Sequence, residues 1–430
     1  MFYYWVTFSM IFERLLGIRA VSGTQWLSGF FACWLFLAVL VPDSIYKHFF
    51  HAAILPLSLY LLISRKQTID WKDPFLGLFL GFCIYMFITT WIVASTSVAD
   101  NGQASRWGLE AGAGMLTFFL WMQNAVKSPR EWGVVFFSAA IAGAFAGLLS
   151  APVEQLLTGR LEGVGAAGHA IQGASILIVF LAVGTFFSFD QQGSRVSRKR
   201  IALGIIAFIL VSIFVVSTKS RAPIVALAVY VLFSISILYF KTRSKLMLGG
   251  VLVVIAGLAG LVHGFIGIPD LIEQLMSRGT SSRLDIWTAY LEYPPKSILL
   301  GNGAGLGFEF TEPHQAYLAP RGLNIVHPHS IWLGAYAETG LIGLAMQFGL
   351  LMLVVWAALR CPCAMSQKLH LLMIVGLFVM LTFSDEYTLL ISVHPVWIFG
   401  WIPLVLVWAW ARDRSGEYDR ELRISGEEAR

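Results

Sequence analysis

The sequence has few charged side chains, and this shortage points to its class. Asp, Glu, Lys and Arg make up 13% of the 430 residues, whereas 57% are apolar residues of the AVILMFWYC set. Soluble proteins carry roughly 25% charged residues, and a soluble core cannot bury this much apolar side chain. The net charge of +5 is also too small and too scattered for a nucleic-acid-binding surface. The composition predicts an all-α polytopic membrane protein with no nucleic-acid partner.

Cysteine and paired acidic residues are scarce as well. Four cysteines are too few for a disulfide framework, and the Cys361-Pro362-Cys363 segment has no second ligand pair that would complete a zinc site. The sequence contains no Asp-x-Asp pair, so a metal-dependent nucleotide-sugar site has no support. We therefore expect no metal and no cofactor.

Apolar runs of about 20 residues are present in number, and each is long enough to cross a bilayer as a helix. Twelve spans are predicted, near 24–42, 48–64, 75–95, 107–123, 133–151, 171–189, 201–217, 222–240, 246–266, 331–357, 369–387 and 394–411. The chain then divides into spans 1–9 (residues 1–266), a large loop (267–330), spans 10–12 (331–411) and a tail (412–430).

The basic residues predict the orientation of these spans. The predicted connections place 21 of the 30 Lys and Arg residues on the side that holds both termini, and basic residues favour the cytoplasm. Both termini are therefore expected to be cytoplasmic. Met1–Arg19 lacks a small-residue cleavage site and is interpreted as a retained amphipathic segment. The far side has two sizeable loops, 152–170 and 267–330, and the longer is expected to hold two short helices and a turn packed over the membrane face.

His329 is the first candidate for chemistry, because it lies where the long loop re-enters the membrane. It is followed by Ser330, a plausible helix cap, and after nine more residues by Gly340 and Gly343. An imidazole at a helix mouth can accept a proton near neutral pH, although many such histidines only cap or anchor a helix. His327 competes for this role, or serves as a structural or metal-binding partner, but no third zinc ligand is evident.

Arginines on the far side form the second group of candidates, because the orientation rule disfavours them there. Arg221 lies in a very short connection at the bilayer boundary, where it either snorkels to headgroups or clamps a phosphate with its two-pronged guanidinium. Arg278 and Arg283 flank a predicted helix start, and Arg160 lies in the shorter far-side loop. Together they favour a site for an anionic, diphosphate-bearing lipid.

Two further features of the sequence, Glu338 and the glycine run, can each be explained by a purely structural role. Glu338, in the first turns of the span after His329, either pairs with a far-side arginine or faces a cavity. The glycines between Gly301 and Gly307 match neither a phosphate loop nor a dinucleotide fingerprint, so they are expected to let the loop turn tightly against the membrane-facing surface.

These segments resemble a known family. The His329-Ser330-x9-Gly340-x2-Gly343 pattern is similar to the signature of bacterial O-antigen ligases. The Ser220–Pro223 segment, and Ser282–Trp287 with the glycine run after it, resemble two other landmarks of the ligase and polymerase superfamily. The resemblance implies a multi-pass protein of the bacterial inner membrane with a fold like C-type glycosyltransferases and its long loop in the periplasm.

The resemblance also implies a reaction. O-antigen polysaccharide would pass from undecaprenyl pyrophosphate to a sugar hydroxyl of lipid A–core, with inversion and without metal or ATP. His329 would be the general base, Arg221 and Arg283 would hold the pyrophosphate, and Arg160, Arg278, Glu338 and His327 are candidate substrate-binding residues. The alternatives are an O-antigen polymerase or a protein O-oligosaccharyltransferase of the same superfamily. A lipid-linked sugar transporter is a rival of another class, but no internal repeat supports it.

Overall fold

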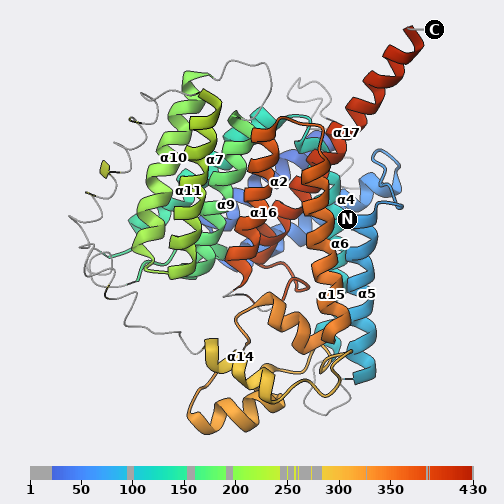
Figure 1. Cartoon of the computed structure of the whole chain (residues 1–430), viewed down its shortest axis with the longest axis vertical. Coiled ribbons are helices and arrows are strands. Elements are labelled where there is room, and N and C mark those ends of the chain that lie inside the picture. The colour runs from blue at the N-terminus through green and yellow to red at the C-terminus, as the bar shows by residue number, and fades with distance from the viewer. Residues whose placement is uncertain are drawn as a thin grey trace.

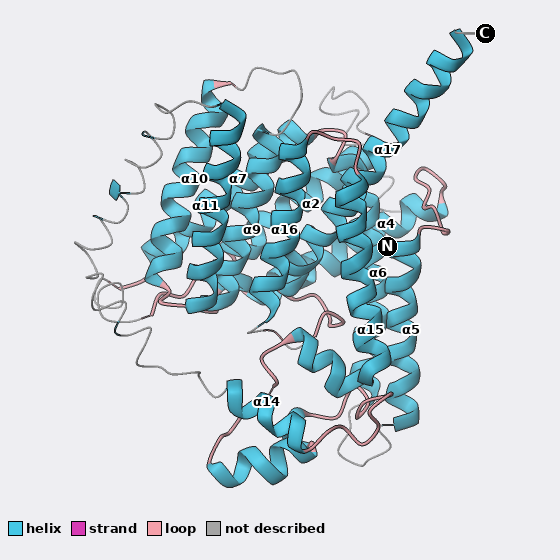
Figure 2. Cartoon of the chain, in the orientation of Figure 1, coloured by secondary structure: helices cyan, strands magenta, loops and turns pink. Residues whose placement is uncertain are grey.

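The computed structural model describes residues 22–93, 101–152, 160–189, 197–242, 283–325, 327–383, 386 and 388–428, with a few isolated positions between 249 and 273. In this part of the chain every regular element is helical (Figures 1 and 2). The elements are α2 (Gly23–Leu40), α3 (Asp43–Phe49), η1 (Phe50–Ile54), α4 (Leu55–Ile63), α5 (Pro74–Val93), α6 (Asn101–Ala125), α7 (Pro129–Ser150), η2 (Gly165–Ala167), α9 (Ala170–Phe189), α10 (Arg198–Ser217), α11 (Arg221–Thr242), α14 (Arg283–Glu292), η3 (Phe308–Phe310), η4 (Pro313–Leu318), η5 (Ala319–Arg321), α15 (Ile331–Arg360), α16 (Met365–Phe383), η6 (Trp397–Trp401) and α17 (Ile402–Glu428).

Eight of the described helical segments are long and apolar enough to cross a membrane: α2, α3 through α4, α5, α7, α9, α10, α15 and α16. The predicted all-α polytopic membrane fold is confirmed. The helices α6, α11 and α17 lie at three further predicted spans, although α6 and α17 carry more polar residues. The predicted span 246–266 lies outside the described residues, apart from isolated positions, so the number twelve stays a prediction.

The last two predicted spans extend too far into the connection between them. Helix α16 ends at Phe383 and not at residue 387, and the next helical segment begins at Trp397 and not at 394. The Trp397 N–H bonds to the His394 carbonyl at 2.9 Å, and Pro395 lies in this first turn, where its missing N–H costs no helical hydrogen bond. Glu386 and His394 therefore lie in a connection between helices.

Aromatic side chains fill the centre of the bundle. Trp34, Trp121, Trp397, Trp401 and Trp410 are all fully buried. Trp397 and Trp401 stack at 4.3 Å between ring centroids. Interfacial belts are the usual place for tryptophan in membrane proteins, but here much of the aromatic content packs the core, which fits the large contact area of these rings.

The described part of the long loop forms a small domain with a core of its own. Helix α14 and the short helices η3 to η5 enclose a separate apolar cluster formed by Ile286, Ala289, Tyr290, Phe308, Leu318 and Ala337. Ala337 belongs to α15, so the cluster ties the loop to the start of that helix. Two short helices and a turn were expected, whereas the described residues of the loop form α14 and the three short helices η3 to η5. Residues 269–282, where the first expected helix begins, lie outside the described residues apart from position 273.

Helix α15 is broken at Gly340, and the glycine-rich loop repairs the break. Gly340 has φ 65° and ψ −164°, a conformation open essentially only to glycine. Backbone groups freed by the break bond to the loop: Asn302 N to Ala337 O (2.8 Å), Gly303 N to Glu338 O (2.9 Å), Leu341 N to Ile298 O (2.9 Å) and Ile342 N to Leu299 O (3.3 Å). The expected tight turn of the glycine run is present, and its partner is the backbone of α15.

Different connections lie at the two ends of the bundle. Figure 1 shows α14 and its loop at one end of the molecule, while α17 projects beyond the bundle at the opposite end. At that opposite end Arg412 of α17 contacts Asp73 and lies 3.2 Å from Asp70, in the connection before α5. The 64–74 loop and the tail therefore meet on one face, as the charge pattern predicts. Which face is cytoplasmic stays a prediction.

Asp73 holds three elements of this face together. Its side chain accepts hydrogen bonds from the Leu76 N–H at 3.0 Å, as a helix cap, and from Trp408 Nε1 at 3.0 Å, besides contacting Arg412. We expect Asp73→Asn to lower the free energy of unfolding by about 2 kcal/mol, because a buried charge-assisted bond is lost. Asp70→Asn, at a half-exposed partner of the same arginine, should cost less than about 1 kcal/mol. Equal losses in thermal unfolding of the detergent-solubilised variants would contradict this.

Candidate functional site

A cavity of about 620 Å³ opens at the end of the bundle that carries the long loop. Its walls come from the segment before α9, the start of α9, the α10–α11 turn, α14, the segment before α15 and the α16–η6 connection. The lining residues are Arg160, His169, Ile171, Gln172, Lys219, Ser220, Arg221, Ala222, Arg283, His327, His329, Glu386 and His394. Five of the seven predicted site residues thus lie around one space: Arg160, Arg221, Arg283, His327 and His329.

The cavity is strongly cationic. Four Lys and Arg side chains face a single carboxylate, Glu386, among the described lining residues. Positive charges held this close repel one another in a site of low dielectric constant, unless an anion lies between them. The cavity therefore suits a ligand with two or more negative charges, and guanidinium groups match the geometry of phosphate oxygens.

The α10–α11 turn holds two of these cationic residues, Lys219 and Arg221, at the cavity wall. Thr218, Lys219 and Ser220 are buried, and Lys219 has a φ of 51°. Arg160 braces the turn from the neighbouring loop, since its Nε donates to Thr218 O at 3.1 Å and its Nη2 to Ser220 Oγ at 2.9 Å. Arg221 then starts α11 at the cavity wall. Arg160 thereby positions the turn as well as lining the cavity.

His329 also has a left-handed backbone conformation, with a φ of 51°. Non-glycine residues adopt this region rarely, and such strain gathers at functional sites. The His329 ring lies 3.9 Å from the His327 ring, centroid to centroid. Burial, with a smaller effect from His169, lowers the pKa of His327, so its neutral form is favoured. Ser330 occupies the cap position of α15, but its side chain makes no capping hydrogen bond there, contrary to expectation.

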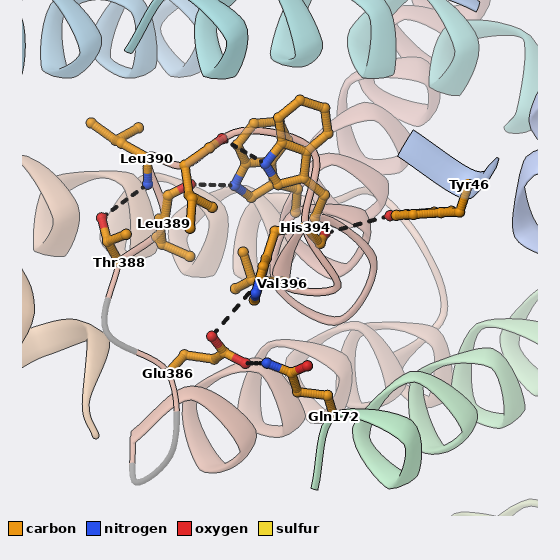
Figure 3. A network of polar contacts seen from close by, with 11 residues as sticks. Tyr46, Gln172, Glu386, Thr388, Leu389, Leu390, His394 and Val396 are labelled. Carbon is orange, nitrogen blue, oxygen red and sulfur yellow. Dashed lines mark hydrogen bonds and ion pairs between the residues drawn. The ribbon is translucent and has the colours of Figure 1, made fainter. Parts of the chain in front are cut away.

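A polar network on the part of the cavity wall formed by α9 and the α16–η6 connection was not predicted. Gln172 Nε2 donates to Glu386 Oε1 at 2.8 Å, and the other carboxylate oxygen lies 3.9 Å from His394 Nδ1 (Figure 3). The Tyr46 hydroxyl donates to the His394 carbonyl at 3.4 Å, which ties this wall to α3. Burial, then Lys47 and His327, lowers the pKa of His394, so a neutral imidazole stands beside the carboxylate.

Two predicted site residues lie elsewhere. Arg278 lies outside the described residues. Glu338 faces a second cavity of about 320 Å³, which is lined by α6, the glycine-rich loop and α15. His327 lines both cavities and forms their boundary. Glu338 therefore lines a cavity, but not the one that holds His329 and the arginines.

Fold and site together define a class: a polytopic α-helical membrane protein with a cationic, histidine-containing cavity at one end of its bundle. A comparison with known proteins points to a family. Residues 206–348, from α10 to the middle of α15, match the family model described as O-antigen ligase, so this part of the chain is similar to the O-antigen ligase superfamily. No curated protein matches the chain. The matched region contains Arg221, Arg283, His329 and both glycine segments.

Proposed function

We propose that the chain is an O-antigen ligase of the bacterial inner membrane. It transfers O-antigen polysaccharide from undecaprenyl pyrophosphate to a hydroxyl of lipid A–core at the periplasmic face, without metal or ATP, and both of its termini are cytoplasmic. The observation that carries the proposal is the shared cavity of His329, Arg221 and Arg283, three residues drawn from separate segments of the family-matched region.

His329 serves as the general base of the transfer. The oxygen of the acceptor hydroxyl attacks the anomeric carbon of the donor sugar while its proton passes to the imidazole. The bond between that carbon and the phosphate oxygen breaks, undecaprenyl pyrophosphate leaves, and the configuration at the carbon inverts. The single carboxylate among the described lining residues, Glu386, is engaged by Gln172, which favours direct displacement over a covalent intermediate.

Arg221 and Arg283 hold the pyrophosphate and stabilise the charge that develops on it as the bond breaks. Stabilisation is effective when the donors are already in place, because no reorganisation is needed during the reaction. The buried α10–α11 turn and its brace by Arg160 supply this order. Lys219 and Arg160 add positive charge, and Arg278 of the adjoining loop is a further candidate.

The deciding experiment uses the purified full chain in lipid nanodiscs with undecaprenyl-pyrophosphate-linked O-antigen and lipid A–core, in the presence of EDTA and without ATP. The proposal expects the core band to shift to a longer glycoform. Growth of the lipid-linked glycan alone would show a polymerase, and glycan on protein would show a protein oligosaccharyltransferase. Movement of the donor across a vesicle bilayer without transfer would show a transporter. Each of these three results overturns the ligase assignment.

Arg221→Lys tests the two-pronged contact with phosphate. The variant keeps the positive charge but loses the planar pair of donors, so we expect kcat/KM for the lipid-linked donor to fall about tenfold to a hundredfold. Arg106→Lys is the matched control, because Arg106 is exposed on α6 and pairs with Glu110 outside the cavity. An unchanged rate in Arg221→Lys would show that simple charge screening is enough.

A further inference from the structure

The second cavity differs in chemistry from the first. It lies between α6, the glycine-rich loop and α15, and its described lining residues include two carboxylates, Glu309 and Glu338, but no Lys or Arg. Trp107, Tyr290 and Phe308 give it aromatic walls. A pyrophosphate finds no Lys or Arg here to neutralise it, whereas an uncharged ring with hydroxyl groups finds both hydrogen-bonding groups and apolar faces. Its volume of about 320 Å³ is at the lower end of the range for small-ligand sites.

Asn302 lines this cavity and carries a buried, unsatisfied donor. The residue is only 6% exposed, and its Oδ1 accepts a hydrogen bond from the Lys296 N–H at 3.0 Å. Its Nδ2 is buried and has no hydrogen-bond partner among the described residues. Leaving an amide donor buried without a partner costs free energy, so its retention calls for an explanation such as a bound ligand. A sugar hydroxyl accepts the hydrogen bond that this group offers.

Asn302 and Glu338 are held in fixed relation by the break in α15. The Asn302 N–H bonds to Ala337 O at 2.8 Å, and the next N–H, of Gly303, bonds to Glu338 O at 2.9 Å. These two bonds hold together the backbone segments that carry the Asn302 and Glu338 side chains, and both residues line the second cavity.

The position of the cavity relates it to the transfer reaction. His327 lines both cavities, and its ring lies 3.9 Å from that of His329. A sugar in the second cavity therefore lies across His327 from the arginine-lined cavity, and His327 is the neighbour of His329. This arrangement suits an acceptor that approaches from the side of His327 while the arginines hold the leaving group.

We propose that the second cavity binds the acceptor: an uncharged sugar ring of lipid A–core, whose hydroxyls contact Asn302 and Glu338 and one of whose faces lies against Trp107. This assignment rests on the proposed function for the identity of the sugar. The cavity itself accounts for the two chemical needs of such a site, namely hydroxyl recognition and exclusion of the charged diphosphate.

The test uses Asn302→Asp, which keeps an oxygen for the Lys296 N–H but removes the amide donors. We expect the KM for lipid A–core to rise about tenfold, with the KM for the lipid-linked donor unchanged. Glu338→Gln, on α15 and outside the loop, is a second variant with the same expected direction. Asn124→Asp, near the other end of α6 from Gln103 and Trp107, makes the same chemical change away from the cavity and should change neither constant. A rise in the donor KM alone would overturn the acceptor assignment.

A binding measurement separates this inference from the proposed function. Delipidated core oligosaccharide is titrated calorimetrically into wild type and Asn302→Asp, both checked for an unchanged unfolding temperature. If the wild type transfers no glycan yet binds the oligosaccharide about tenfold more tightly than the variant, the ligase proposal fails and the cavity assignment stands. If the wild type transfers glycan, and Asn302→Asp binds the oligosaccharide and transfers glycan as well as the wild type does, the cavity assignment fails and the ligase proposal stands. Absence of both transfer and binding overturns both.

Discussion

His329→Asn is expected to lose about a hundredfold to ten-thousandfold of the transfer rate, the range that a general base contributes. Asparagine suits this position because His329 has a φ of 51°, and asparagine tolerates the left-handed region better than alanine does. The variant therefore keeps the backbone at the mouth of α15 while removing the group that accepts the proton. The rate is measured with saturating lipid-linked donor and lipid A–core in nanodiscs.

Two other histidine variants sharpen this result. His327→Gln removes the neighbouring ring, and a loss there as large as in His329→Asn would move the base to His327. His48→Ala removes an exposed imidazole on α3, outside the cavity, and should leave the rate unchanged. A folded His329→Asn protein that transfers glycan at the wild-type rate would contradict the base assignment.

Two arginines of the cationic cavity could be predicted from the sequence because their positions depart from the rule that basic residues favour the cytoplasmic side. Arginines are disfavoured on the far side of a membrane, so Arg221 and Arg283 are informative from their positions between predicted spans alone. Composition and hydropathy predict the fold class for a similar reason, since 57% apolar residues leave few alternatives to a membrane bundle. Both predictions rest on free-energy costs that depend on one residue at a time: the cost of placing an arginine on the far side of the membrane, and the cost of exposing an apolar side chain to water.

Glu386 and His394 were missed because they stand at the ends of apolar runs and fall within the predicted spans. A signal is present, since an ionisable residue at a span is a functional hypothesis by default. Their pairing with each other, and with Gln172 of α9, depends on how separate helices pack. No local pattern in one sequence contains that information.

The contact between the Gly301 and Gly340 segments could likewise not be predicted from the local sequence of either segment. Gly301 and Gly340 each resemble a turn or packing glycine in their own segments. In the folded chain a Cβ built on Gly301 would lie 2.5 Å from the Glu338 carbonyl carbon, and one on Gly340 would overlap the carbonyl of Leu299. Each glycine thus lets the backbone of the other segment approach, and only the folded chain shows this.

Gly340→Ala is accordingly expected to lower the free energy of unfolding by about 3 kcal/mol or more. Its backbone lies in a region that costs a non-glycine residue about 1–3 kcal/mol, and the new methyl group would overlap backbone atoms of the loop that cannot rotate away. Because that loop carries Asn302, the second cavity should be lost together with stability. Thermal unfolding in detergent and binding of core oligosaccharide measure the two effects.

Gly376→Ala is the matched control for this substitution. Gly376 lies within α16, and a Cβ there meets no other atom within 4 Å, so the exchange should be neutral or stabilise the protein by up to about 1 kcal/mol through helix propensity. If Gly340→Ala unfolds at the same temperature as Gly376→Ala, the two halves of α15 do not depend on the loop for their hydrogen bonds. The break would then be a local kink, and the link between the glycine segments and the second cavity would have to be abandoned.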